Sequence, residues 1–139
     1  MKIISHRGNL SGVCDEENKP RQIEKALDSG FDCEIDLWYI AGKLMLGHDA
    51  PLYEIDFSFI SKPGLWVHAK NIEVLNYLNE TNINYFFHNN DKATLTSHRY
   101  IWCYPGVYCE RGITVLTGRE QMFNKEVYGI CTDYPLDFI

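Results

Sequence analysis

The sequence predicts an α/β fold built around a mainly parallel sheet of about seven strands. The first observation is that short β-prone segments recur about every 20–30 residues, separated by loops or short helical segments. The second is that polar side chains followed by glycine stand directly after such a segment, as in His6-Arg7-Gly8, which is typical of a loop after a strand in an α/β protein. The predicted strands span residues 3–5, 33–39, 65–68, 84–87, 100–104, 113–116 and 129–132.

Helices and loops fill the intervals between these strands. Pro20 suits the first turn of a helix that runs to about Ser29, where Gly30 ends it. Apolar residues at helical spacing predict a second helix over residues 72–79, and a short third helix is expected from residue 118 to about residue 126. Residues 9–17 and 52–60 are expected to be loop, the latter with a short helical turn. Residues 43–46 return beside the second strand as a β-arm.

The composition suits one globular domain over residues 1–139. Its hydrophobic content is 45%, its aromatic content is 14%, and its length suits a single core. The net charge of -6 argues against a nucleic-acid-binding surface. No apolar run is long enough to span a membrane and the first residues lack a signal-peptide pattern, so we expect a cytoplasmic protein. The five cysteines include no CxxC pair and suit free thiols in a reducing compartment.

Glu34-Ile35-Asp36 is the stretch on which the functional prediction depends. Side chains alternate along a strand, so both carboxylates point to the same face. Burying two like charges side by side is costly unless a cation neutralises them, which favours a metal ion. The alternative is an edge strand on which Glu34 and Asp36 face solvent.

Three short motifs occur in order along the first third of the chain: His6-Arg7-Gly8, Glu34-Ile35-Asp36-Leu37 and Gly47-His48-Asp49. Together they resemble the opening of the glycerophosphodiester phosphodiesterase family, which belongs to the phosphatidylinositol-phospholipase-C-like group of TIM barrels. The resemblance is closest over residues 1–50 and returns at Thr132-Asp133-Tyr134-Pro135, which matches a Thr-Asp-x-Pro ending. A full barrel needs about 250 residues. The resemblance therefore implies a compact, shortened TIM-like barrel of mainly parallel strands with reduced helices.

The same resemblance implies roles for six side chains. His6 and His48 would act as general acid and general base. Arg7 and Lys70 would bind the phosphate, and Glu34 and Asp36 would bind the metal. Imidazole titrates near neutral pH, and arginine and lysine suit phosphate oxygens. The resemblance also implies attack by a neighbouring hydroxyl of the substrate through a cyclic phosphate. The residues alone leave open which histidine is the acid.

His68 is a departure from the family pattern. The family usually has Glu-x-Lys on its third strand, where this chain has His68-Ala69-Lys70. Mg²⁺ or Ca²⁺ is the ion expected at a carboxylate site, whereas a His68 ligand favours a less oxygen-demanding ion such as Mn²⁺ or Zn²⁺. Alternatively, Glu34 and Asp36 hold the metal with waters and without His68.

His88, Trp102 and Asp133 are further candidates for a substrate pocket. His88 ends a predicted strand, where a loop-capping role is equally open. Trp102 and Tyr104 share one face of their strand and either line a pocket or belong to an aromatic core. Asp133 either orients a ligand or Lys70, or is an ordinary loop acid.

Two functions from different classes follow from these residues and from the family resemblance. The first is a metal-dependent phosphodiesterase that cleaves a glycerol- or sugar-linked phosphodiester, or a larger glycoconjugate of the kind found in surface-polysaccharide metabolism. A lyase that releases the cyclic phosphate is a variant of it. The second is a catalytically degenerate barrel that binds a phosphorylated ligand or partner, which the short chain and His68 suggest. The open strand edges of a small barrel can pair with those of another chain, so a homodimer is a further expectation.

Overall fold

The computed structural model describes residues 1–119 and 126–139. Its strands are β1 (Lys2–His6), β2 (Asp32–Ile40), β3 (Lys43–Leu46), β4 (Tyr53–Ile55), β5 (Leu65–Ala69), β6 (Tyr85–Phe87), β7 (Ala93–Leu95), β8 (Ile101–Cys103), β9 (Ile113–Leu116) and β10 (Gly129–Thr132). Its helices are α1 (Pro20–Asp28), α2 (Phe57–Ile60), α3 (Ile72–Asn79) and the 3₁₀ helix η1 (Pro135–Phe138). The helix predicted from residue 118 to about residue 126 falls mostly outside the described residues.

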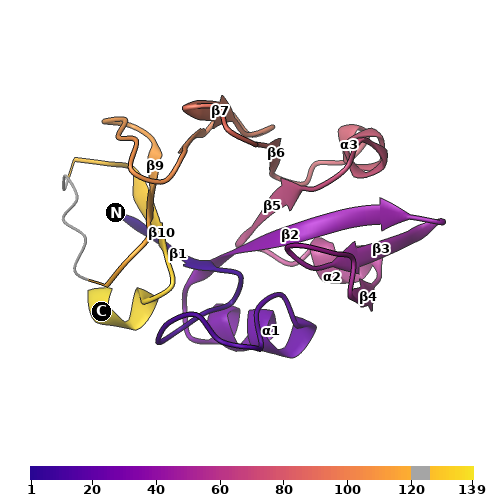
Figure 1. Cartoon of the computed structure of the whole chain (residues 1–139), viewed down its shortest axis with the longest axis horizontal. Helices are drawn as coiled ribbons and strands as arrows, with labels where there is room; N and C mark the ends of the chain where they lie inside the picture. The colour runs from indigo at the N-terminus through magenta and orange to yellow at the C-terminus, as the bar shows by residue number, and fades with distance from the viewer. Residues whose placement is uncertain (120–125) are drawn as a thin grey trace.

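The ten described strands form one curled, mixed sheet with the shape of a half-barrel (Figure 1). Parallel pairs join β6, β5, β2, β1, β10, β9 and β8 in that order. Antiparallel pairs add β3 to β2, β4 to β3, and β7 to β8. The long strand β2 pairs with β1 along its first residues and with β3 along its last ones, while β5 pairs with its other edge. β2 is therefore the strand on which three neighbours are aligned.

The predicted TIM-like barrel of mainly parallel strands is wrong. Within the described residues the sheet is mixed, and no ladder joins β6 to β7 or β8, so the strands do not close into a ring. The three α-helices have nine, four and eight residues. The reason lies in the connections, because a parallel crossover takes a dozen or more residues. Ala41 and Gly42, with φ of 51° and 76°, instead make a two-residue turn that sends β3 back antiparallel.

Local sequence signals predicted some elements well and missed others. Helix α3 has the predicted bounds, and α1 ends one residue before the predicted Ser29. Strands β4 and β7, each of three residues, were not predicted. Strands this short contain too few residues to show an alternating pattern. None of the helices in the described residues has the length and apolar character needed to cross a membrane.

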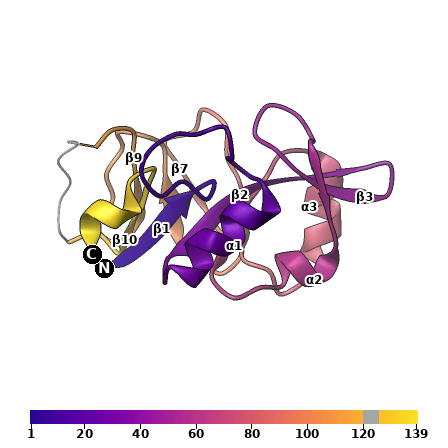
Figure 2. The same cartoon turned by 90° about the horizontal axis from the view of Figure 1, so that it is seen from below.

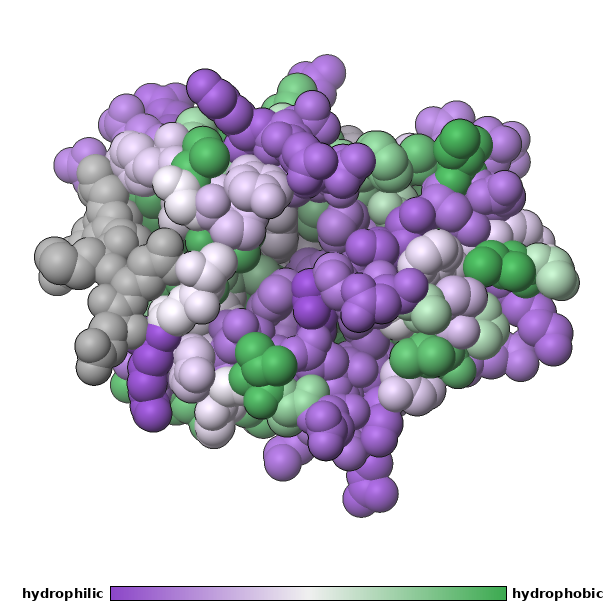
Figure 3. Space-filling model, viewed as in Figure 1, coloured by the Kyte–Doolittle hydropathy of each residue, from purple (hydrophilic) through white to green (hydrophobic). Residues whose placement is uncertain are grey.

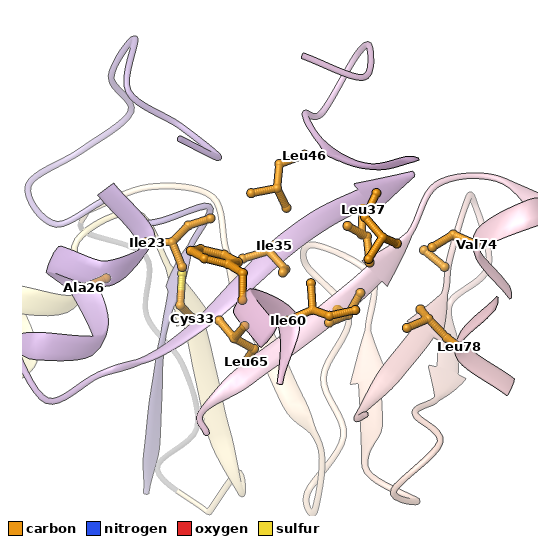
Figure 4. Close-up of a cluster of buried hydrophobic side chains, with 14 residues drawn as sticks. Ile23, Ala26, Cys33, Ile35, Leu37, Leu46, Ile60, Leu65, Val74 and Leu78 are labelled. Atoms are coloured by element: carbon orange, nitrogen blue, oxygen red, sulfur yellow. The ribbon is translucent and has the colours of Figure 1, made fainter. Parts of the chain in front are cut away.

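The main hydrophobic core lies between the outer face of the sheet and the helices (Figures 2 and 4). Cys33, Ile35 and Leu37 of β2 point into it, with side chains from α1, α2, α3 and β5. Because side chains alternate, Glu34 and Asp36 point to the opposite face, inside the curl. A second cluster lies inside the curl and consists of Ile4, Trp66, Phe86, Trp102, Ile113, Val115 and Cys131.

Candidate metal centre and phosphate pocket

Strand register brings the predicted site residues to one end of the sheet. His6 at the end of β1 pairs with Glu34 on β2, and Asp36 pairs with His68 on β5. Side chains of paired residues on one face of a sheet lie next to one another. His48 reaches the same end because the β3 arm returns along β2, and the backbone N–H of Gly47 donates to the Asp36 carbonyl over 3.2 Å.

Glu34, Asp36 and His68 form the candidate metal centre. One ligand atom from each lies within 4.8 Å of the other two. Nδ1 of His68 is 3.2 Å from Asp36 Oδ1 and 3.8 Å from Glu34 Oε1. Both acids are almost fully buried, and Glu34 Oε2 and Asp36 Oδ1 accept no hydrogen bond. Buried carboxylate oxygens normally accept hydrogen bonds, so two that accept none beside an imidazole fit a divalent cation. The alternative of a solvent-facing edge strand is wrong, because β2 is paired on both edges.

The two carboxylates differ in their surroundings. Burial and the charge of Asp36 raise the pKa of Glu34 above its usual range. Burial also disfavours the charged form of Asp36, but His48, His68 and Arg7 outweigh it and hold the pKa of Asp36 well below its usual range. Asp36 is therefore ionised, while Glu34 gains its charge more easily once a cation lies between them.

Arg7 and Lys70 supply positive charge beside Asp36. Nε of Arg7 is 3.3 Å from Asp36 Oδ2, and Nζ of Lys70 is 3.9 Å from Asp36 Oδ1. The two Nη nitrogens of Arg7 contact Glu17 Oε2 at 2.9 Å and His48 Nε2 at 3.2 Å. Each Nη nitrogen carries a second hydrogen, so the guanidinium keeps donors for a phosphate oxygen. Its backbone φ of 56° is rare outside glycine, which indicates local strain at this position.

His6 and Asp133 form a hydrogen-bonded pair. Nδ1 of His6 is 2.8 Å from Asp133 Oδ1, which also accepts from Asn9 Nδ2 at 2.8 Å. A carboxylate only accepts, so Nδ1 carries the hydrogen and Nε2 lies toward Glu34, 3.9 Å from Oε2. Burial lowers the pKa of His6, but Asp133 and Glu34 outweigh it and raise that pKa above its usual range. Asp133 thus orients His6, whereas the sequence suggested a ligand or Lys70 as its partner.

His48 has the opposite tautomer. A guanidinium only donates, so His48 Nε2 accepts from Arg7 Nη2 and the hydrogen lies on Nδ1. Nδ1 is 3.4 Å from Asp36 Oδ2 and makes no hydrogen bond. The two histidines therefore present different atoms to the metal centre: an acceptor from His6 and a donor from His48.

A cavity of about 270 Å³ adjoins the metal centre, and its wall includes every predicted site residue except Asp36 and Lys70. The face seen in Figure 3 is hollowed near its centre, with hydrophilic residues along the side toward β2. Trp102 is 4% exposed and belongs to the inner core as well as to the cavity wall. His88 lines the cavity with both ring nitrogens buried and unpaired, and its ring lies edge-on to Tyr104 with the centroids 5.8 Å apart.

Sequence reasoning missed the residues that hold the loop after β1. Asn18 is buried and donates from Nδ2 to Asp36 Oδ2 at 2.9 Å, while its Oδ1 accepts from the Asp36 backbone N–H at 3.0 Å. Glu17 accepts from Arg7 and from Asn9 Nδ2. The available signal was weak: Asn18 tolerates its φ of 62°, but an asparagine before Lys19-Pro20 also suits an ordinary loop.

Comparison of the chain with protein-family models, with curated proteins and with solved structures finds no match in any of the three. Function is therefore inferred from the residues and geometry described above.

Proposed function

We propose that the protein is a metal-dependent phosphodiesterase similar to the glycerophosphodiester phosphodiesterase family. The observation that carries the proposal is the metal centre of Glu34, Asp36 and His68, with two buried unpaired oxygens, flanked by His6 and His48. A phosphodiester repels nucleophiles, so its cleavage needs cations at the phosphate and groups that move protons on both sides. A divalent cation held by the three ligands would neutralise charge on a non-bridging phosphate oxygen.

The ring nitrogens that the two histidines turn toward the metal centre, Nε2 of His6 and Nδ1 of His48, support a division of roles. His6 accepts the proton of the attacking hydroxyl at Nε2, and Asp133 stabilises the resulting imidazolium through Nδ1. His48 acts as the acid in its doubly protonated form: it gives the Nδ1 proton to the oxygen of the leaving alcohol and keeps the proton on Nε2, which in this form does not accept from Arg7. A neighbouring hydroxyl of the substrate attacks phosphorus, the bond to the leaving alcohol breaks, and a cyclic phosphate forms. Water then opens the ring with the two histidines in reversed roles.

Arg7 and Lys70 hold the phosphate in this proposal. Both cations lie within 4 Å of Asp36. Arginine donates in a fixed fork and lysine acts as a point charge, so together they fix the remaining phosphate oxygens.

The substrate class in this proposal is a glycerol- or sugar-linked phosphodiester, including a glycoconjugate of surface-polysaccharide metabolism. Trp102, Tyr104 and His88 on the cavity wall suit the apolar face of a ring or chain on one alcohol. The five free thiols favour a reducing compartment, so the proposal includes a cytoplasmic location. A homodimer through the end strands β4 or β7 is also part of it, tested by light scattering after size-exclusion chromatography.

Phosphorus NMR with a glycerophosphodiester tests the reaction. We expect a phosphomonoester when divalent metal is present and no turnover in excess chelator. His6→Ala together with His48→Ala should abolish turnover, and His98→Ala, at an exposed histidine, should leave it unchanged. Accumulation of the cyclic phosphate as the final product would identify a lyase. Full activity in chelator or in the double variant would overturn the proposal.

The second candidate is a protein that binds a phosphorylated ligand or partner without cleaving it. The observation that favours it is the replacement of the family's third carboxylate by His68, which also lies close to Asp36. Calorimetry with glycerol phosphate separates the two. Binding with no turnover under any divalent metal would support this second candidate.

A further inference from the structure

His68 is held in a fixed orientation at this site. Its Nε2 lies 3.0 Å from the backbone carbonyl oxygen of His88. A carbonyl oxygen only accepts hydrogen bonds, so Nε2 carries the hydrogen. The ring also stacks on Phe86, with the centroids 5.0 Å apart and the planes 13° apart. A hydrogen bond to a carboxylate, a backbone carbonyl or a water commonly fixes the tautomer of a metal-binding histidine.

This tautomer leaves the lone pair of Nδ1 facing the two carboxylates. Nδ1 and Asp36 Oδ1 are only 3.2 Å apart, yet Oδ1 accepts no hydrogen bond. Two lone pairs at this distance repel each other unless a proton or a metal cation lies between them. Glu34 Oε1 approaches the same nitrogen at 3.8 Å. The three groups therefore converge on one point with two oxygens and one nitrogen.

The charge around that point does not favour a hard ion. Arg7 and Lys70 lie beside Asp36 and offset the two carboxylate charges. Mg²⁺ and Ca²⁺ depend on many anionic or carbonyl oxygens, with six to eight ligands for Ca²⁺. First-row transition ions gain more from an imidazole nitrogen and accept fewer ligands.

We propose that the site binds a first-row transition ion such as Mn²⁺, Co²⁺ or Zn²⁺ through Nδ1 of His68, in preference to Mg²⁺ or Ca²⁺. The inference rests on the proposed function for its metal. The atom that selects the chemical class of that metal is Nδ1 of His68. The carbonyl of His88 and the ring of Phe86 act through His68 and are positioning groups.

Binding without substrate tests this inference. Metal-free protein is titrated with Mn²⁺, Zn²⁺ and Mg²⁺ by calorimetry, and the Mn²⁺ form is examined by pulsed electron paramagnetic resonance for coupling to a ring nitrogen. We expect nitrogen coupling in the natural protein and its loss in His68→Glu. That variant should also lower the Zn²⁺-to-Mg²⁺ affinity ratio by at least about tenfold.

The chain offers a matched control in His98. Its Nε2 also contacts a backbone carbonyl, that of Asn82 at 2.7 Å, but the residue is exposed and lies outside the cavity wall. His98→Glu should leave both the coupling and the affinity ratio unchanged. Absence of nitrogen coupling in the natural protein, or an affinity ratio unchanged in His68→Glu, would overturn the inference.

The outcome is separable from that of the proposed reaction. Nitrogen coupling without turnover of any diester would support the metal inference and count against the phosphodiesterase. Turnover with Mg²⁺ and no nitrogen coupling would support the phosphodiesterase and count against the metal inference.

Discussion

At the residue scale, Glu34 shows how a binding site lowers the stability of the metal-free protein. Its carboxyl is 2% exposed, lies beside Asp36, and has one oxygen without a hydrogen bond. Burial and Asp36 raise its pKa, so the folded protein holds this proton more tightly than the unfolded chain does. Without metal, stability therefore falls as pH rises from the usual glutamate range through the raised pKa, and it stays low above that range.

We predict that Glu34→Gln stabilises the metal-free protein above the raised pKa. An amide of similar volume removes the buried charge and its repulsion with Asp36. A buried polar atom without a hydrogen bond costs about 1–3 kcal/mol, and a charged one costs more, so we expect a gain of about 1 kcal/mol or more. Urea unfolding in chelator at several pH values measures the difference, which should grow with pH and then level off. Glu54→Gln, at an exposed acid on β4, should show no such pH dependence. A Glu34→Gln protein that is less stable at pH 8 would contradict the prediction.

The two histidines provide a second residue-scale prediction. If His48 protonates the leaving alcohol, a substrate whose leaving group departs without a proton should not need His48. His48→Ala should slow cleavage of a glycerophosphodiester by about 10²–10⁴-fold, but slow cleavage of the p-nitrophenyl ester of glycerol phosphate by less than about tenfold. His6→Ala should slow both by about 10²–10⁴-fold, because the attacking hydroxyl is the same. Equal losses in the two variants on both substrates would contradict this division of roles.

At the element scale, the loop after β1 is held to β2 by one buried side chain. Asn18 satisfies both Oδ2 and the backbone N–H of Asp36. Its left-handed backbone conformation, with φ of 62°, is one that asparagine tolerates better than alanine. Asn18 therefore links the two residues: its backbone N–H donates to the Arg7 carbonyl, and its side chain binds Asp36.

We predict that Asn18→Ala lowers both stability and metal affinity. Two buried hydrogen bonds are lost, which should cost about 2–4 kcal/mol of unfolding free energy. Asn71→Ala is the matched control. Asn71 also bonds the β2 backbone, at Tyr39, and caps α3 through Val74, whereas Asn18 bonds the metal ligand Asp36 itself. Denaturant unfolding should show a similar loss for both variants, and calorimetry should show weaker metal binding only for Asn18→Ala. Equal metal affinity in the two variants would count against this role for Asn18.

The ends of α1 and α3 and the hairpin of β2 and β3 were the best-predicted features. Pro20 at the start of α1 and Asn71 at the start of α3 act locally, the latter by accepting from the Val74 backbone N–H at 3.0 Å. The hairpin at Ala41-Gly42 is local as well. In contrast, β4 and β7 exist because they add to β3 and β8. Each has only three residues, which is too short to show a periodic pattern, even though its partner strand is near in the chain.

At the scale of the whole molecule, both faces of the curled sheet carry buried side chains. The outer face packs against the helices, and the inner face holds an aromatic cluster in which Phe86 and Trp102 stack with centroids 4.4 Å apart. Three of the five cysteines are buried in or beside these two layers. Their thiols belong to the packing and not to the site chemistry.

We predict that the thiols fall into two classes of reactivity. Cys14 is exposed and Cys109 partly exposed, so iodoacetamide at pH 8 should modify Cys14 first and Cys109 more slowly. Burial raises the pKa of Cys103 to about 11 and that of Cys131 well above its usual range, so neither is a thiolate at pH 8. Mass spectrometry should find Cys33, Cys103 and Cys131 modified only after unfolding. Rapid alkylation of Cys131 in the folded protein would contradict this packing.

Taken alone, the sequence determined the local features: which segments extend, where two helices begin, that Glu34 and Asp36 share a face, and the order in which His6, Glu34 and His48 occur. These depend on neighbouring residues, on side-chain alternation and on caps, so they can be inferred without a partner strand. Tertiary structure alone decided that the sheet is a mixed half-barrel, that Asn18 holds Asp36, and that Asp133 orients His6. It also decided that the His88 carbonyl turns His68 toward the carboxylates. Register and long-range hydrogen bonds arise between segments far apart in the chain, because burial and backbone pairing across the whole sheet select them and no local pattern encodes them.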